Sequence, residues 1–213
     1  MSIANIVIEK DRALIGVDTL AGYMQEGRHL LNEVHYRARH AGKLTLFPQF
    51  DSAMTNRGDG LLTSIVRVGL ETECPYDFDD AVEMMPGILS TAYTQATTHR
   101  KQLGIEAFPG AEVVLVGWSP RNSRYLAVRW CRYPEYEDFT EKFFDDRLLL
   151  PDIDNLQQVE TPDTDAKMEA LVRDQVAWAA SEHPNLTCGG RLVMAELTRG
   201  AVTVRTIADL EAE

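Results

Sequence analysis

The chain lacks any apolar run long enough to cross a lipid bilayer, which takes about 20 consecutive residues. Its first residues also lack the basic segment and continuous apolar stretch of a secretory signal, so we expect a cytoplasmic protein without membrane contact. Cysteine is scarce: Cys74, Cys131 and Cys188 are far apart, and no two form a Cys-x-x-Cys pair. An odd, scattered set of thiols favours reduced cysteines in a cytosolic protein over a disulfide framework.

Basic residues are also few, since 21 Lys and Arg face 33 Asp and Glu and leave a net charge of −12. Proteins that bind nucleic acid need a basic surface for the phosphates, so we expect no nucleic-acid partner. Residues 135–165 hold eleven of the acidic residues and only two basic ones, a local charge of −9 that leaves −3 for the rest. This acidic excursion is interpreted as a solvated surface segment, with a docking patch for a basic partner as the alternative.

No internal repeat, heptad run or low-complexity segment divides the 213 residues. Hydrophobic residues at 45% and charged residues at 25% are ordinary values for a globular protein, and the length suits one large domain. We therefore predict a single domain over residues 1–213, with the acidic excursion at about 135–165.

Four strand pairs are predicted from short β-prone runs that flank polar turns. One pair is bent at Pro48, and the others are simple hairpins. The pairs cover residues 3–8 with 13–17, 43–58, 111–130, and 191–197 with 201–207.

Three helices are predicted between these strand pairs. A short helix suits residues 60–71, and a longer one over 78–103 has Asp77 as its N-cap. The third helix is expected to open at Thr161, with a proline at the first helical position. Antiparallel pairs with helices in blocks do not form alternating βαβ units, so we predict an α+β fold of two antiparallel sheets with helices packed outside.

Four segments carry a distinctive order of residues: SIANIVIEKDRALIGVDT, GKLTLFP with MTNRG, EVVLVGWSPRNSRYLAV, and AWAASEHPNLTCGGRLVMAEL. Together they resemble the proteasome-type N-terminal nucleophile (Ntn) hydrolases, which include proteasome β subunits and a bacterial ATP-dependent protease of the same fold. In that family the nucleophile begins the first strand, an Asp ends the second, a Lys opens the third and a Gly marks the turn into the first helix. The residues at the matching places are Ser2, Asp18, Lys43 and Gly58. The resemblance implies a four-layer αββα sandwich of two antiparallel sheets flanked by helices.

The resemblance also implies hydrolysis of peptide or amide bonds by Ser2 after removal of Met1. A serine hydroxyl needs a base to take its proton, and a free α-amine with a pKa near 8 can serve close to neutral pH. Lys43, held by Asp18, would favour deprotonation of Ser2. The backbone N–H at Gly58 would stabilise the oxyanion of the tetrahedral intermediate. No cofactor is implied.

Two supporting positions depart from the family pattern. The stretch WCRYPEYEDF lacks the family's Gly-Ser-Gly-like turn, and HPNLTCGG has Asn185 and Cys188 roughly where the family has Asp and Ser. Asn carries no charge and a thiol is a weak hydrogen-bond partner, so a non-catalytic, ring-forming subunit of the same fold is the alternative. A third hypothesis keeps only the architecture and has the acidic excursion bind a basic partner.

The resemblance implies self-association into rings and a peptide or protein substrate, and it leaves an unfoldase partner open. The connection over residues 27–42 contains His29, His35 and His40, whose spacing matches no metal-binding pattern. We expect this connection to be a solvated loop without a metal, close to the site if the fold of the family holds.

Overall fold

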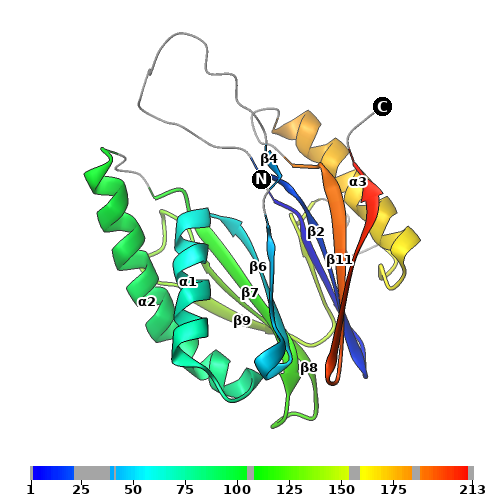
Figure 1. Ribbon diagram of the computed structural model, residues 1–213. Helices are drawn as coiled ribbons and strands as arrows, with labels where there is room; N and C mark the ends of the chain where they lie inside the picture. The colour runs from blue at the N-terminus through cyan, green and yellow to red at the C-terminus, as the bar shows by residue number, and fades with distance from the viewer. Residues whose placement is uncertain are drawn as a thin grey trace.

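Two antiparallel sheets of five strands face one another in the computed structural model (Figure 1). The structure describes residues 2–21, 39–40, 42–104, 108–153, 159–183 and 188–210. The first sheet has the strand order β10-β1-β2-β11-β12, and the second has the order β5-β6-β7-β8-β9. Strands β3 and β4 form a separate two-stranded pair.

The four predicted strand pairs are present and antiparallel. The predicted bend at Pro48 is a short 3₁₀ helix, η1 (Pro48–Phe50). The strands are β1 (Ala4–Ile8), β2 (Arg12–Asp18), β3 (Leu20–Ala21), β4 (Arg39–His40), β5 (Leu44–Phe47), β6 (Ser52–Gly58), β7 (Ala111–Ser119), β8 (Arg124–Arg132), β9 (Thr140–Phe144), β10 (Arg147–Leu150), β11 (Arg191–Thr198) and β12 (Ala201–Asp209).

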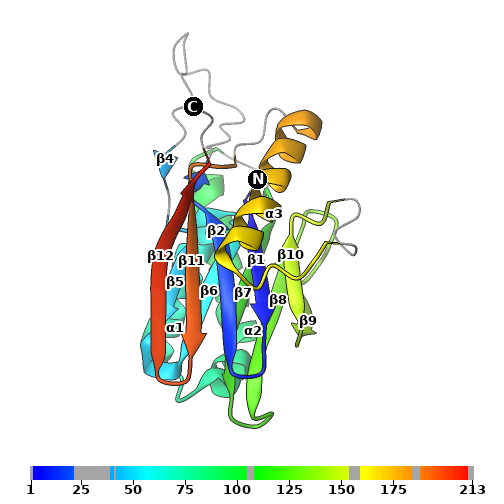
Figure 2. The same cartoon turned by 90° about the vertical axis from the view of Figure 1, so that its right-hand side faces the viewer.

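Helices lie on the outer faces of both sheets (Figures 1 and 2). The helices α1 (Gly60–Glu73) and α2 (Phe78–Gln102) cover the second sheet, and α3 (Asp165–Glu182) covers the first. The side chains of Asp59 and Asp77 accept hydrogen bonds from the first backbone N–H groups of α1 and α2. The predicted N-cap at Asp77 is therefore confirmed.

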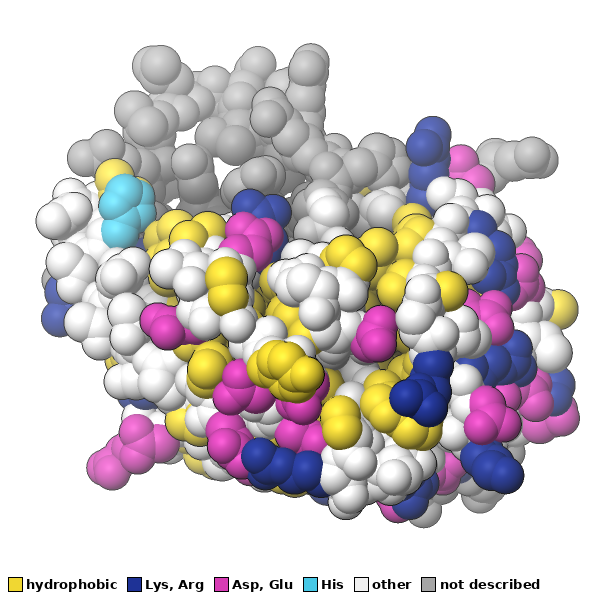
Figure 3. Space-filling model, turned by 60° about the horizontal axis from the view of Figure 1, so that its bottom comes forward, with side chains coloured by type: hydrophobic (Ala, Val, Ile, Leu, Met, Phe, Trp, Pro, Cys, Tyr) yellow, Lys and Arg dark blue, Asp and Glu magenta, His cyan; other side chains and the backbone are white. Residues whose placement is uncertain are grey.

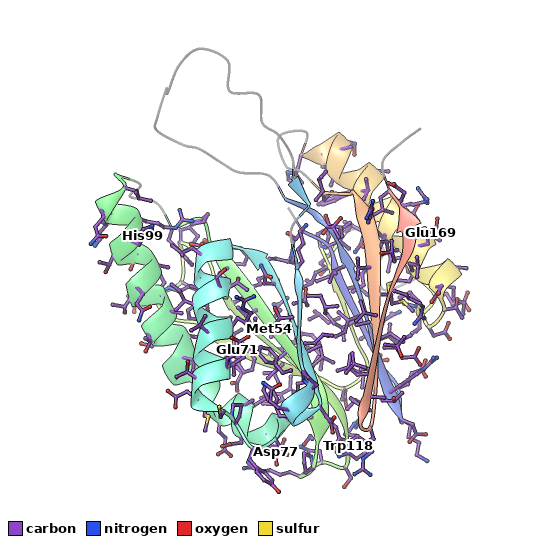
Figure 4. The ribbon with its side chains drawn as sticks, in the orientation of Figure 1. Met54, Glu71, Asp77, His99, Trp118 and Glu169 are labelled. Carbon is purple, nitrogen blue, oxygen red and sulfur yellow. The ribbon has the colours of Figure 1, made fainter. Side chains whose placement is uncertain are left out.

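Alternate residues of a strand supply different layers of the core, because successive side chains point to opposite faces. On β6, Ala53 faces the first sheet, while Met54 points towards α1 and α2 (Figure 4). On β1, Ile6 packs between the sheets and Val7 packs under α3. Burial on both faces explains why β1 and β2 are almost continuously apolar.

The prediction of a complete four-layer αββα sandwich is wrong for the helix layer on the first sheet. Within the described ranges α3 is the one helix on that sheet, and β12 at its edge is largely exposed. A helix with its side chains is about 10–12 Å wide and strands lie about 4.8 Å apart, so one helix covers two or three strands. The fold is α+β, with two five-stranded antiparallel sheets and three helices in the described residues, consistent with a sandwich.

The start of α3 also differs from the prediction. The helix begins at Asp165, and Thr164 is its N-cap, because the Thr164 hydroxyl accepts a hydrogen bond from the N–H of Lys167. Thr161, the predicted N-cap, precedes the helix. The position of α3 is determined by its contact with the sheet, where Gln175 and Asn5 exchange two buried hydrogen bonds of 2.7 and 3.1 Å.

The acidic excursion contains the strands β9 and β10, which pair with β8 and β1 respectively. The side chains of β9 are mostly exposed, whereas Leu148, Leu149 and Leu150 of β10 are buried. At the end of the molecule that carries the β7–β8 turn, acidic, basic and hydrophobic side chains are interspersed (Figure 3). No helix in the described part of the chain is both long and apolar enough to span a membrane.

Candidate functional site

A buried ion pair joins two of the residues singled out from the sequence. Asp18 is the last residue of β2, and Lys43 directly precedes β5. The Lys43 Nζ lies 2.7 Å from the Asp18 Oδ1, and their side chains are only 5% and 0% exposed. The same ammonium donates a second hydrogen bond of 2.5 Å to the carbonyl of Leu20.

The Asp18 carboxylate also receives two backbone N–H groups. The N–H of Ile3 donates to Oδ1 at 2.8 Å, and the N–H of Gly189 donates to Oδ2 at 2.9 Å. Because Ile3 follows Ser2, the N–H that this carboxylate binds belongs to the peptide bond between the proposed nucleophile and Ile3. Asp18 therefore connects four segments of the chain: the start of β1, the end of β2, the residue before β5, and the loop before β11.

Burial lowers the pKa of the Lys43 ammonium below its ordinary value, since the charged form loses its water. The attraction and hydrogen bond of Asp18 act in the opposite direction, and the nearby charge of Arg57 adds a smaller lowering of this pKa. The ion pair with Asp18 holds the positive charge of Lys43 at the end of the sheets where Ser2 lies.

The lowered pKa of Lys43 predicts a pH dependence of stability. Between its folded-state pKa and 10.5 the unfolded chain holds more protons at Lys43 than the folded chain, so the free energy of unfolding rises with pH in this window. The slope from one group is at most about 1.4 kcal/mol per pH unit. Urea unfolding of the wild type and of Lys43→Met from pH 7 to 10.5 isolates this contribution. A difference between the two proteins that does not change with pH would contradict the prediction.

Ser2 is half-buried and lies just before β1. Its carbonyl oxygen accepts a hydrogen bond of 2.7 Å from the Nε of Arg57. Arg57 directly precedes Gly58 on β6, so the side chain next to the proposed oxyanion donor contacts the residue proposed as the nucleophile. The structure thus brings Ser2, Asp18, Lys43 and Gly58 to the same end of the two sheets.

Gly58 is the last residue of β6 and lies opposite Ala111 of β7. The neighbouring N–H of Asp59 donates to the carbonyl of Gly110 at 3.0 Å. On the other side of β6 the pairing with β5 ends where Leu44 lies opposite Thr55. Gly58 therefore lies past the last paired residue of β5. A backbone N–H at such a strand end suits an oxyanion donor.

Several residues at this site were not predicted from the sequence. Arg57 binds the two carboxylate oxygens of Glu112 through Nη1 at 3.1 and 3.2 Å, and the hydroxyl of Tyr133 donates to the same carboxylate. Glu112 is only 4% exposed. A single charged residue within the otherwise buried, apolar β7 was the signal that could have identified Glu112.

The remaining sequence candidates lie at or beyond the edge of the site. Cys188 precedes Gly189, and burial raises the pKa of its thiol. Asn185, His29 and His35 lie outside the described residues. In the described ranges no three His, Cys, Asp or Glu side chains come together as metal ligands would.

In its fold the chain is similar to solved structures of Anbu. No protein-family model and no curated protein matches its sequence. Among solved structures, Anbu from Yersinia bercovieri, described as an ancestral beta-subunit, has a TM-score of 0.62 at 12% identity, over 98% of this chain and 88% of that chain. The Anbu (Gly-1) mutant from Hyphomicrobium sp. strain MC1 has the same TM-score and identity, over 98% and 87%. A second Anbu structure from that strain has a TM-score of 0.57 at 13% identity, over 98% and 88%.

These neighbours correct the resemblance drawn from the sequence. The sequence segments indicated proteasome β subunits and the bacterial ATP-dependent protease, whereas the structural similarity is to Anbu. At 12–13% identity this similarity shows a shared fold and not membership of a family.

Proposed function

We propose that this chain is a hydrolase of peptide or amide bonds, with Ser2 as an N-terminal nucleophile once Met1 is removed. The observation that carries the proposal is the buried Asp18–Lys43 pair, whose carboxylate also binds the N–H of Ile3. An ion pair this deeply buried is costly unless its partners are well placed, and here it lies beside a half-buried serine.

The chemistry is an acyl transfer in two steps. The Ser2 oxygen attacks the substrate carbonyl carbon while the hydroxyl proton passes to the α-amine, and that proton then goes to the leaving amine as the amide bond breaks. Water hydrolyses the resulting ester and regenerates Ser2. Lys43 stabilises the negative charge that develops on the Ser2 oxygen, and the N–H of Gly58 donates to the oxyanion.

The second candidate function is a non-catalytic structural subunit. It is favoured by the four segments that Asp18 holds together, since such a cross-link stabilises the fold with or without chemistry. Because one solved neighbour is described as a beta-subunit, we also propose that the chain self-associates, whichever of the two functions it has. Size-exclusion chromatography with light scattering measures the mass of the particle independently of reactivity.

The mass of the intact, natively expressed protein tests whether Ser2 becomes the first residue. We expect a mass short by one methionine, followed by labelling with a peptide epoxyketone, which forms a ring with both the hydroxyl and the α-amine of a terminal serine. Ser2→Thr should keep the adduct and Ser2→Ala should lose it, with both variants folded as the wild type is. Retention of Met1, or an adduct that survives Ser2→Ala, would overturn the nucleophile proposal and favour the structural subunit.

A further inference from the structure

The peptide bond that follows Ser2 is held from both sides by charged groups. The Nε of Arg57 donates to the Ser2 carbonyl at 2.7 Å, and the Asp18 carboxylate accepts the N–H of Ile3 at 2.8 Å. Strand pairing of β1 with β2 and β10 begins only at Ala4. Ser2 therefore lies beyond the sheet, and these two contacts determine the plane of its peptide bond.

Arg57 is itself held rigidly. Its Nη1 donates to both carboxylate oxygens of Glu112, and a guanidinium is planar, so fixing Nη1 also fixes the direction of Nε. Glu112 lies directly opposite Arg57 in the register of β6 and β7. The carboxylate also compensates the partly buried positive charge of Arg57, which keeps the guanidinium beside Ser2 without a large desolvation cost.

Tyr133 completes this chain of contacts just after the end of β8. Its hydroxyl donates to Glu112, and burial followed by that hydrogen bond raises the pKa of Tyr133, so the phenol remains a donor. The ring packs against Gly110, where an added Cβ would lie 2.6 Å from the Tyr133 Cδ1. The carbonyl of Gly110 in turn accepts the N–H of Asp59, next to Gly58.

We propose that Arg57 is a positioning residue for the Ser2 nucleophile, and that Glu112 and Tyr133 hold its guanidinium in place. This inference rests on the proposed function, because it assigns a role to the residues behind that nucleophile. If the hydrogen bond of Arg57 only stabilised the sandwich, the guanidinium could donate to any carbonyl of β1. It donates instead to the carbonyl of Ser2, the residue that carries the proposed nucleophilic hydroxyl and lies outside the strand ladder.

Positioning predicts a loss of reactivity that exceeds any loss of stability. Displacement of a reacting group by about 1 Å can lower a rate about 100-fold. We expect Arg57→Lys and Glu112→Gln to lower the first-order rate of Ser2 labelling by the peptide epoxyketone, kinact, about 10- to 100-fold. The half-saturating concentration KI should stay within about twofold, since no residue of this chain of contacts is expected to bind the peptide.

Tyr133→Phe is the mildest variant, because it removes one hydroxyl and retains the ring against Gly110. We expect a smaller fall in kinact, about 3- to 10-fold, in a protein that unfolds cooperatively as the wild type does. Tyr125→Phe is the matched control: Tyr125 is also buried, its hydroxyl has no hydrogen-bond partner among the described residues, and it pairs with Trp118 at the opposite end of the sheet (Figure 4). Tyr125→Phe should leave kinact unchanged.

The outcomes separate the inference from the proposed function. If the wild type forms no adduct at Ser2, both are overturned. If the wild type is labelled and all three variants react at its rate, Arg57 is only structural and the inference alone fails. A fall in kinact with an unchanged KI in Tyr133→Phe, but not in Tyr125→Phe, supports it even where Arg57→Lys does not fold.

Discussion

Asp18→Ala is expected to lower the free energy of unfolding by about 3–5 kcal/mol, because it leaves the buried Lys43 ammonium without its counter-charge. Two backbone N–H groups, of Ile3 and Gly189, lose their acceptor at the same time. Lys43→Met should cost clearly less. In that variant the Asp18 carboxylate keeps both N–H donors, so its charge remains partly compensated.

The double variant Asp18→Ala/Lys43→Met separates stability from reactivity. It removes the unpaired ammonium, so it should be more stable than Asp18→Ala alone, as found when whole buried ion pairs are replaced. Labelling of Ser2 should nevertheless fall at least about 100-fold in all three proteins, because the positive charge that stabilises the Ser2 oxygen is lost or no longer held in place. Urea unfolding and the epoxyketone labelling rate measure the two effects. Equal losses of stability in the two single variants would show that the unpaired ammonium is not the main cost.

Gly58→Ala is expected to destabilise the protein by about 2–5 kcal/mol through two separate costs. The φ of Gly58 is +84°, a left-handed conformation that costs an L-residue about 1–2 kcal/mol. An added Cβ would also lie 2.4 Å from the carbonyl oxygen of Gly110, and a backbone oxygen cannot move aside cheaply. Relieving the overlap costs about 1–3 kcal/mol more and shifts the backbone N–H of Gly58, the proposed oxyanion donor.

Gly200→Ala provides the matched control for this variant. Gly200 has φ +76°, but no atom of the described residues lies within 4 Å of an added Cβ, so only the conformational cost of about 1–2 kcal/mol applies. The labelling rate of Ser2 should fall about 100-fold in Gly58→Ala, the scale of losing one oxyanion donor, and stay unchanged in Gly200→Ala. If the two variants lost the same stability and neither changed the rate, the proposed close approach and the proposed role of Gly58 would both be wrong.

The hairpins could be predicted because their signals are local. Residues 3–8 and 13–17 are β-prone and flank a polar turn. No end of the two observed strands differs from its predicted position by more than one residue. The strands β9 and β10 were missed because the acidic excursion around them was interpreted as a solvated surface segment. Their β structure comes from pairing with β8 and β1, since strand propensity depends on the neighbouring strand more than on the residues themselves.

The residue at which α3 starts was also decided by tertiary contacts and not by the local sequence. Both Thr161 and Thr164 precede an apolar stripe, and either hydroxyl can cap a helix. The choice of Thr164 follows from where α3 packs on the sheet, with Met168 buried and Gln175 bonded to Asn5. No local feature of the sequence contains that information.

For the site, the sequence by itself determined the order of residue types: a Ser before the first strand, an Asp at the end of the second, a Lys before the third and a Gly before the first helix. Each of these four residues lies at or near the end of a strand, because local hydrogen bonding and the length of the hairpin determine where each strand begins and ends. Only the tertiary structure decided that Arg57 reaches the carbonyl of Ser2, and that Gly189 donates to Asp18 across 171 positions. These contacts form when the two sheets pack, because burial of apolar side chains brings the strand ends together. The local sequence at one strand end does not predict which other strand end it will contact.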